Sequence, residues 1–230
     1  MLAEHYLQQL HNNYWFAQLD PDARQFILQH AQVLHYDKEQ LVFAAGDAYD
    51  GIYAILEGSV RIAHIDLQGQ EAVTLIAEPI MWFGEISLID RQPRSHHTIT
   101  AKKSVLLRLN THDLNQYLQQ QPSFWFHIAQ LTSQKLRFAF LELVSLQIQS
   151  ISQRLAQRLL FILSGYGNHI ATDNYIIHLS QEQLAQMLVC SRQTINQELQ
   201  TMEKLGVIQV SFKKIEVLDR NKLQQLAHQS

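Results

Sequence analysis

The spacing of apolar residues changes along the chain and divides it into three parts. Between about residues 34 and 109 the apolar residues come in short runs separated by turn-forming residues. The runs are Leu41–Phe43, Ile52–Leu56, Val60–Ala63, Ala72–Ile76 and Val105–Leu109. Short strands at such regular spacing are typical of a β-sandwich or a barrel-like roll. Residues 1–30 favour a short helical lead-in, with Pro21 opening a helical turn.

The second part, from Pro122 to about Gly165, contains no glycine and no internal proline, so it can be helical. Its apolar residues form two adjoining stripes. They are Leu131, Phe138, Leu141 and Ile148 in one stripe, and Leu136, Phe140, Leu143 and Leu146 in the other. A helix that is apolar on two faces needs two partners. We expect the chain's own roll on one side and the same helix of a second chain on the other, which predicts a homodimer. Burial of the helix inside one large monomeric core is the alternative.

An amphipathic helix is predicted to follow over Ser150–Ser164, and the third part then predicts helix, turn, helix and hairpin. Ser180 to Gln183 fits a capping box at the start of the first helix, and Ser191 can cap the second. The apolar runs Val207–Val210 and Ile215–Leu218 predict the hairpin. This order of elements is that of a winged helix.

The second of these helices carries side chains suited to reading DNA. Ile195, Leu199 and Met202 mark its buried face. The opposite face begins with Ser191, Arg192, Gln193, Asn196 and Gln197. Arginine pairs with guanine, and glutamine or asparagine with adenine, in the major groove. In the hairpin, Lys213 or Lys214 is expected to contact phosphate. An ordinary solvated helical hairpin is the alternative.

Charge agrees with a DNA-binding surface near the C-terminus. The whole chain has a net charge of −3, but residues 1–149 carry −5 and residues 150–230 carry +2. With 47% hydrophobic and 17% charged residues the chain has the composition of a globular protein. It shows no signal peptide and no apolar run long enough to cross a membrane, so we expect a cytoplasmic protein without a membrane partner.

A second cluster of functional residues lies between the predicted strands. Gly84 and Glu85 stand in the run Phe83–Ile89, and Pro93, Arg94 and Ser95 follow. Glycine lets backbone approach a ligand, and arginine neutralises a phosphate through paired hydrogen bonds. Glutamate can accept a hydrogen bond from a sugar hydroxyl. An ion pair of Glu85 with Arg94 inside the loop is the structural alternative.

These segments resemble the CRP/FNR family of bacterial regulators. The resemblance rests on Leu184-Ala185, Cys190–Ile195, Leu205–Ile208 and Arg154–Leu160 in the C-terminal part. In the N-terminal part it rests on Gly46-Asp47, Ile52–Ile62 and the run from Phe83 to Ser95, which resembles the phosphate-binding cassette of cyclic-nucleotide-binding domains. It covers roughly residues 34–218.

The resemblance implies an α+β fold with three parts. They are a β-roll effector-sensing domain over 1–121, a long dimerisation helix over 122–149, and a winged-helix DNA-binding domain over 150–230. It implies a dimeric, sequence-specific transcription regulator that binds a roughly palindromic operator and has RNA polymerase as a further partner. No set of catalytic residues stands out, so we expect no enzyme. A dimeric DNA-binding protein whose roll is only structural is the alternative.

The resemblance also implies roles for single residues. Arg192, Gln193 and Gln197 occupy base-reading positions. Gly84, Glu85, Arg94 and Ser95 occupy the ribose–phosphate positions of a cyclic nucleotide such as cyclic AMP, and Ala139 and Phe140 stand where hydroxyl residues face adenine. Phe140 can stack on a base or fill its site. His96 and His97 replace small residues beside the phosphate. The effector is therefore a cyclic nucleotide, another small anion, or none.

Three further features bear on chemistry. The family commonly has glycine in the turn where this chain has Val189, and a left-handed backbone there would cost valine about 1–2 kcal/mol. The single cysteine, Cys190, is expected to pack in the same turn rather than act as a redox switch, and it cannot form a disulfide or cluster within the chain. The twelve histidines are scattered, and the adjacent His96 and His97 should point apart on a strand, so no metal site is expected.

Overall fold

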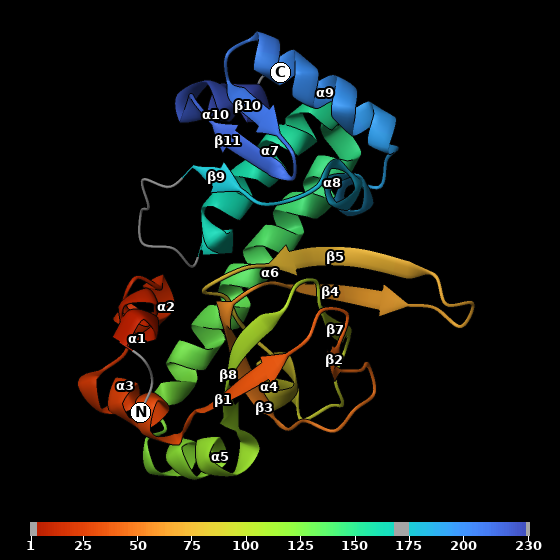
Figure 1. The fold of residues 1–230 in the computed structure, drawn as a ribbon. Coiled ribbons are helices and arrows are strands. Elements are labelled where there is room, and N and C mark those ends of the chain that lie inside the picture. Colours follow the sequence, from red (N-terminus) through yellow and green to blue (C-terminus); the bar gives the residue numbers. More distant parts are fainter. Residues whose placement is uncertain (1–3, 168–174, 229–230) are drawn as a thin grey trace. The chain divides into compact units, whose positions relative to one another are not determined.

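The computed structural model describes residues 4–167 and 175–228, which form two compact units. The first unit comprises residues up to Lys135, and the second begins at Leu136. The division falls within the long helix α6 (Phe124–Ile148), so this helix contributes to both units (Figure 1). Within the described ranges, no helix combines the length and apolarity needed to cross a bilayer.

The first unit is built on two four-stranded antiparallel sheets, which confirms the predicted β-roll (Figure 1). One sheet has the order β1 (Gln32–Tyr36), β8 (Ser104–Asn110), β3 (Gly51–Glu57), β6 (Trp82–Phe83). The other has the order β2 (Leu41–Phe43), β7 (His97–Thr100), β4 (Val60–Ile65), β5 (Glu71–Ala77). All five apolar runs are strands. Strands β1, β6 and β7 were not predicted, because they are short and rich in polar residues or lie at the cassette loop.

Helices cover this roll and close its core. The lead-in forms α1 (Glu4–His11), α2 (Tyr14–Ala17) and α3 (Pro21–His30), as predicted, and α4 (Ile86–Asp90) and α5 (Thr111–Gln120) follow strands. Trp15 of α2 packs against Trp82 at 5.0 Å between ring centroids, and its indole N–H donates to the His127 carbonyl at 2.6 Å. These contacts join lead-in, sheet and the start of α6 in one hydrophobic core.

The second unit contains the helix-turn-helix and its wing. It comprises α7 (Ile151–Leu163), β9 (Ile176–Ile177), α8 (Gln181–Leu188), α9 (Arg192–Lys204), β10 (Ile208–Ser211), β11 (Lys214–Val217) and α10 (Arg220–His228), together with the end of α6. The three strands form an antiparallel sheet of order β10-β11-β9. The predicted capping box is present, with Ser180 and Gln183 each bonded to the other's backbone N–H.

The helical segment after Pro122 is interrupted, which corrects the expected continuation through Ser150. Ser150 lies outside the helices and caps α7 in a capping box with Gln153. Serine side chains compete for backbone hydrogen bonds, so they favour helix ends over helix interiors. The chain therefore begins a new helix at Ile151.

The apolar residues at the end of α6 are exposed on the single chain. Leu131 is 1% exposed, but seven large apolar side chains beyond it are 45–76% exposed. These are Leu136, Phe140, Leu141, Leu143, Val144, Leu146 and Ile148, and we call them the α6 stripe. A helix buried in one large monomeric core would not show them, so that alternative is wrong.

Candidate DNA-binding surface and effector site

The start of α9 carries the predicted DNA-reading side chains on one face. The Ser191 hydroxyl accepts a hydrogen bond from the Thr194 N–H at 3.0 Å and caps the helix. Ile195, Leu199 and Met202 are buried against the rest of the unit. This orientation leaves the side chains of Arg192, Gln193 and Gln197 exposed. The helix N-terminus thus offers three polar side chains of the types that read base edges.

Asn196 differs from its neighbours on this face. It is half-buried, and its side-chain oxygen accepts a hydrogen bond from the Gln181 amide of α8 at 3.1 Å. The predicted pairing of Asn196 with adenine therefore competes with a contact that holds α9 on α8. Its role at a base stays a prediction.

The turn between α8 and α9 has the left-handed backbone considered in the sequence analysis. Val189 has φ 53° and ψ 52°, and its side chain is 84% exposed. Backbone N–H groups of Val189 and Cys190 bond back to the end of α8, and the Arg154 guanidinium donates to the Leu188 carbonyl at 2.8 Å. These bonds hold the turn although valine disfavours it.

Cys190 is half-buried in this turn, and burial raises the pKa of its thiol. A raised thiol pKa means less thiolate at neutral pH. This environment agrees with a packing residue.

The wing presents an aromatic side chain that the sequence analysis did not assign to the site. Phe212 and Lys213 form the two-residue turn between β10 and β11, and Phe212 is 89% exposed. The Lys213 ammonium lies 5.2 Å from the centre of the Phe212 ring. Lys214 is on β11 and pairs with Glu216 at 3.0 Å. A large aromatic residue in a hairpin turn is the sequence signal that could have identified Phe212.

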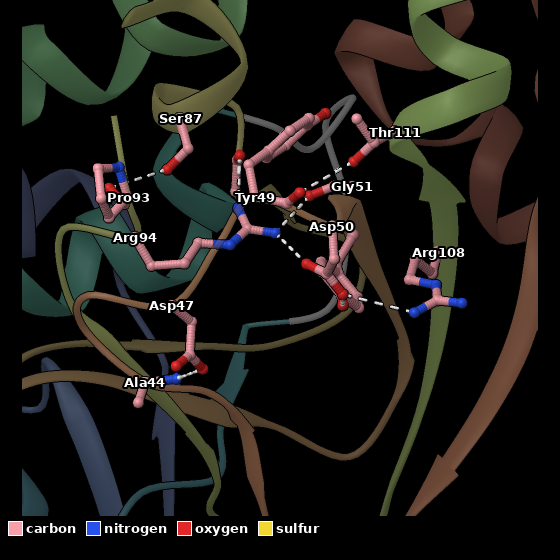
Figure 2. A network of polar contacts seen from close by, with 12 residues as sticks. Ala44, Asp47, Tyr49, Asp50, Gly51, Ser87, Pro93, Arg94, Arg108 and Thr111 are labelled. Carbon is pink, nitrogen blue, oxygen red and sulfur yellow. Dashed lines mark hydrogen bonds and ion pairs between the residues drawn. The ribbon is translucent and has the colours of Figure 1, made fainter. Parts of the chain in front are cut away.

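Arg94 lies at the centre of the cassette and points into the protein. Its guanidinium donates to the Gly84 carbonyl at 2.8 Å, the Gly51 carbonyl at 2.6 Å and the Asp50 carboxylate at 2.5 Å (Figure 2). The side chain is 2% exposed and lies over the Phe43 ring at 4.2 Å. Gly84 permits this arrangement, because a Cβ there would lie 2.9 Å from the arginine and its φ is 91°.

Asp50 is the ionic partner of Arg94, which corrects the expected alternative of a Glu85–Arg94 pair. The same carboxylate accepts from the Tyr53 hydroxyl and pairs with Arg108 at 3.4 Å (Figure 2). Burial and the Asp50 carboxylate raise the pKa of Tyr53, so its hydroxyl stays protonated at neutral pH. Sequence spacing did not indicate Asp50, because strand β3 brings it to the cassette from more than 40 residues away.

Glu85 is buried and bound to α6 instead. Its carboxylate accepts from the Lys135 ammonium at 2.6 Å, and the residue is 1% exposed. Its second oxygen, Oε1, is buried without a hydrogen-bond partner. A buried carboxylate oxygen without a donor costs free energy, so this atom is suited to a ligand hydroxyl.

The two histidines after Ser95 point apart. His97 Nδ1 accepts from the Ala45 N–H at 3.4 Å. His96 contacts the Ser95 hydroxyl through Nδ1 at 2.9 Å, and its Nε2 is buried without a partner. Burial and the nearby Lys135 ammonium lower the pKa of His96 to about 4, so the ring is neutral at physiological pH.

The remaining predicted effector residues are placed differently. Ser95 is exposed and bonds only to the neighbouring His96 among the described residues. Phe140 lies in the second unit and is 59% exposed. Its contact with an effector stays a prediction. Within the described ranges, no group of three acidic, histidine or cysteine side chains is arranged to hold a metal ion.

Two family profiles match this chain, one in each of the regions described above. The profile of the cyclic nucleotide-binding domain matches residues 33–121, and that of the Crp-like helix-turn-helix domain matches residues 153–226. The chain belongs to the CRP/FNR family of transcription regulators. Together the matched segments make up well over half of the CRP/FNR-family chain, and they include the cassette, α9 and the wing.

Characterised relatives agree with this family assignment. The Cyclic AMP receptor protein of Thermus thermophilus is 28% identical over 92% of this chain and 95% of its own length. A CRP-like cAMP-activated global transcriptional regulator of Mycobacterium tuberculosis is 25% identical over 90% of this chain and 93% of its own length. Among solved structures, the Catabolite Activator Protein of Thermus thermophilus is 27% identical with a TM-score of 0.51 and covers 93% of this chain and 97% of its own. The structure of FixK2 from Bradyrhizobium japonicum is 16% identical and shows the shared fold, with a TM-score of 0.75. The match covers 87% of this chain and 98% of FixK2.

Proposed function

We propose that this CRP/FNR-family regulator acts in the cytoplasm as a homodimer that binds a roughly palindromic operator and contacts RNA polymerase. The observation that carries the DNA-binding part is the face of α9. There the Ser191 cap and the buried Ile195 orient Arg192, Gln193 and Gln197 outward at the helix start. In a helix-turn-helix protein this part of the second helix enters the major groove.

The DNA contact proposed for each residue follows from the chemistry of its side chain. Arg192 pairs with guanine O6 and N7, and Gln193 and Gln197 contact neighbouring bases. Lys213 and Lys214 of the wing contact phosphate, which adds affinity without sequence preference. Phe212, exposed beside Lys213, is suited to pack against the sugar edge of a groove. Dimerisation through the α6 stripe supplies two such surfaces for the two half-sites.

The test begins with the selection of operators from random DNA by the purified full-length protein. Arg192→Ala should then weaken operator binding by about 1–3 kcal/mol per half-site and relax preference at one base pair. Lys213→Ala should weaken specific and random DNA alike and flatten the dependence of affinity on salt. Equal losses on operator and random DNA for Arg192→Ala would contradict its base-reading role.

We also propose an effector function for the cassette, in which a small anion with hydroxyl groups, such as a cyclic nucleotide, binds beside Glu85. The observation in its favour is the pair of unpartnered buried atoms, Glu85 Oε1 and His96 Nε2. A ribose hydroxyl can donate to Glu85, and Lys135 retains ammonium hydrogens for a phosphate. Arg94 fits a phosphate less well as it stands, because Asp50 and two carbonyls already accept from it.

Calorimetry with cyclic AMP and cyclic GMP tests the effector function. We expect binding of at least one nucleotide, and similar affinity for both, because Ala139 and Phe140 replace the hydroxyl residues that face adenine. Glu85→Gln should weaken binding about tenfold or more through loss of a charge-assisted hydrogen bond. No heat at millimolar concentration of either nucleotide would reject nucleotide control and leave a roll that is only structural.

A further inference from the structure

A cavity in the first unit is lined in part by Tyr49, whose ring also lies beside Arg94. Its volume is about 500 Å³, which is within the range of small-molecule sites. The side chains that line it come from α4, α5, the start of α6 and the loop before β3. They are Tyr49, Ser87, Leu88, Arg91, Asn115, Leu118, Gln119 and Trp125. None of them is among the residues assigned to DNA or to the cyclic nucleotide.

The floor of this cavity is largely apolar, with two buried hydroxyl groups, of which that of Ser87 already donates to the Pro93 carbonyl at 3.4 Å. Leu88 and Leu118 are each 4% exposed. The Tyr49 hydroxyl is buried and has no hydrogen-bond partner. Burial raises the pKa of Tyr49, so the hydroxyl remains a protonated donor at neutral pH. A buried donor of this kind is stabilised by any acceptor that enters the cavity.

The rim is polar and carries a cation. The side chains of Arg91, Asn115 and Gln119 form no hydrogen bond or ion pair with another described residue, and all three residues are exposed. Asn115 and Gln119 are four residues apart, so they project from the same face of α5. The indole of Trp125 completes the rim and is 38% exposed. Such a rim can bind an anion and stack against a planar ring at once.

The backbone holds Arg91 in an unusual conformation at this rim. Arg91 ends α4 in the left-handed region, with φ 57°, and its N–H bonds to the Ser87 carbonyl at 3.1 Å. A residue other than glycine in this region costs of order 1 kcal/mol and is found preferentially at ligand sites. The side chain therefore leaves the helix end at the mouth of the cavity.

We propose that this cavity is a second ligand site, which binds a planar aromatic molecule with an anionic group. The ring lies on Leu88, Leu118 and Trp125, and the guanidinium of Arg91 binds the anionic group. The Tyr49 hydroxyl donates to a polar atom at the buried end of the ligand. The site shares none of the predicted ribose–phosphate residues, but Tyr49 connects it to them, since its ring lies 5.0 Å from the Arg94 guanidinium (Figure 2).

The test uses 2-naphthoate and its uncharged analogue 2-naphthamide as probes, with the full-length protein and calorimetry. We expect 2-naphthoate to bind at micromolar to millimolar concentration, and 2-naphthamide about tenfold more weakly or worse. The indole N–H signal of Trp125 should shift in NMR spectra, and those of the buried Trp15 and Trp82 should not. This readout reports binding directly and does not depend on operator binding.

Variants distinguish this cavity from the effector cassette. Arg91→Asn removes the cation but keeps a residue that tolerates positive φ, and it should weaken 2-naphthoate about tenfold. Tyr49→Phe keeps the ring against Arg94 and should weaken the probe several-fold, while Lys103→Gln, at an exposed lysine elsewhere in the unit, should have no effect. The proposal is overturned by no binding at millimolar probe, by equal binding of the two probes, or by binding that Lys135→Gln abolishes and Arg91→Asn leaves unchanged.

Discussion

Val189 shows how one residue can be unfavourable where it stands and still be held by its surroundings. Its exposed side chain contributes little burial to offset the left-handed backbone. Instead, the hydrogen bonds of the turn and the donation from Arg154 to Leu188 fix the backbone of this loop. The left-handed residue between α8 and α9 is thus maintained by the fold and not by its own preference.

Replacement of Val189 by glycine should therefore stabilise the second unit. We expect a gain of about 0.5–1 kcal/mol in the free energy of unfolding, since relief of the left-handed strain outweighs the extra chain entropy of glycine. Leu205→Gly is the matched control, because Leu205 ends α9 with an ordinary φ of −77° and is also exposed. Chemical denaturation should show the control destabilised. Destabilisation by both changes would contradict the strain argument.

His96 makes the stability of the first unit sensitive to acid. The folded-state pKa of about 4 lies below the ordinary value of 6.5, so the unfolded chain takes up a proton first as the pH falls. The contribution of this residue is complete above pH 6.5 and is lost progressively down to about pH 4. The groups that set its charge balance are Lys135, Glu85, Arg94 and His97.

The variant His96→Gln should remove this dependence. Between pH 7 and pH 5 the wild-type protein should lose about 1–2 kcal/mol more unfolding free energy than the variant. His97→Gln, at the neighbouring histidine, should behave as the wild type. Denaturation curves at the two pH values measure the difference, and identical losses in all three proteins would show that His96 is not held neutral.

At the scale of elements, local sequence signals predicted where structure begins and ends. The capping box at Ser180 and the cap at Ser191 are present because a serine hydroxyl satisfies an exposed N–H wherever the following residues are helical. The same chemistry interrupts the helical segment at Ser150, a signal that apolar spacing alone did not reveal. Short strands such as β6 and β7 were not delimited, since their pairing with β3 and β4 stabilises them more than their own composition does.

At the scale of the whole molecule, the α6 stripe is the feature that a single chain leaves uncovered. Phe138, next to it, packs on Phe161 at 4.8 Å and on Tyr166, so it serves the core of the second unit. The exposed side chains of the α6 stripe are therefore free to pack against a second chain. Burial of such large side chains contributes about 1.5–3 kcal/mol each, which is enough for the helices of two chains to associate.

Replacing Leu136 and Leu143 by glutamate should therefore give a folded monomer. Both side chains are more than half exposed, so the charges should disrupt the dimer seam and leave each unit intact. Sedimentation should show the change in mass, and operator binding should fall because half-sites are then contacted singly. Gln147→Glu adds a charge at an exposed position of the same helix and should remain dimeric. A wild-type monomer at micromolar concentration that still binds operator would contradict the role of the stripe.

The sequence by itself determined the elements whose signals are local. Strand runs, helix caps, the helix-turn-helix and the exposed face of α9 follow from residue types within a few positions of one another, since capping and side-chain periodicity act over one or two turns. The family resemblance added the positions of the cassette. Only the tertiary structure decided which ion pairs the cassette forms. Asp50 pairs with Arg94, and Lys135 pairs with Glu85, because distant segments of the chain pack beside the loop. The cavity at Tyr49 arises in the same way, since α4, α5 and the start of α6 meet there only once the roll has folded.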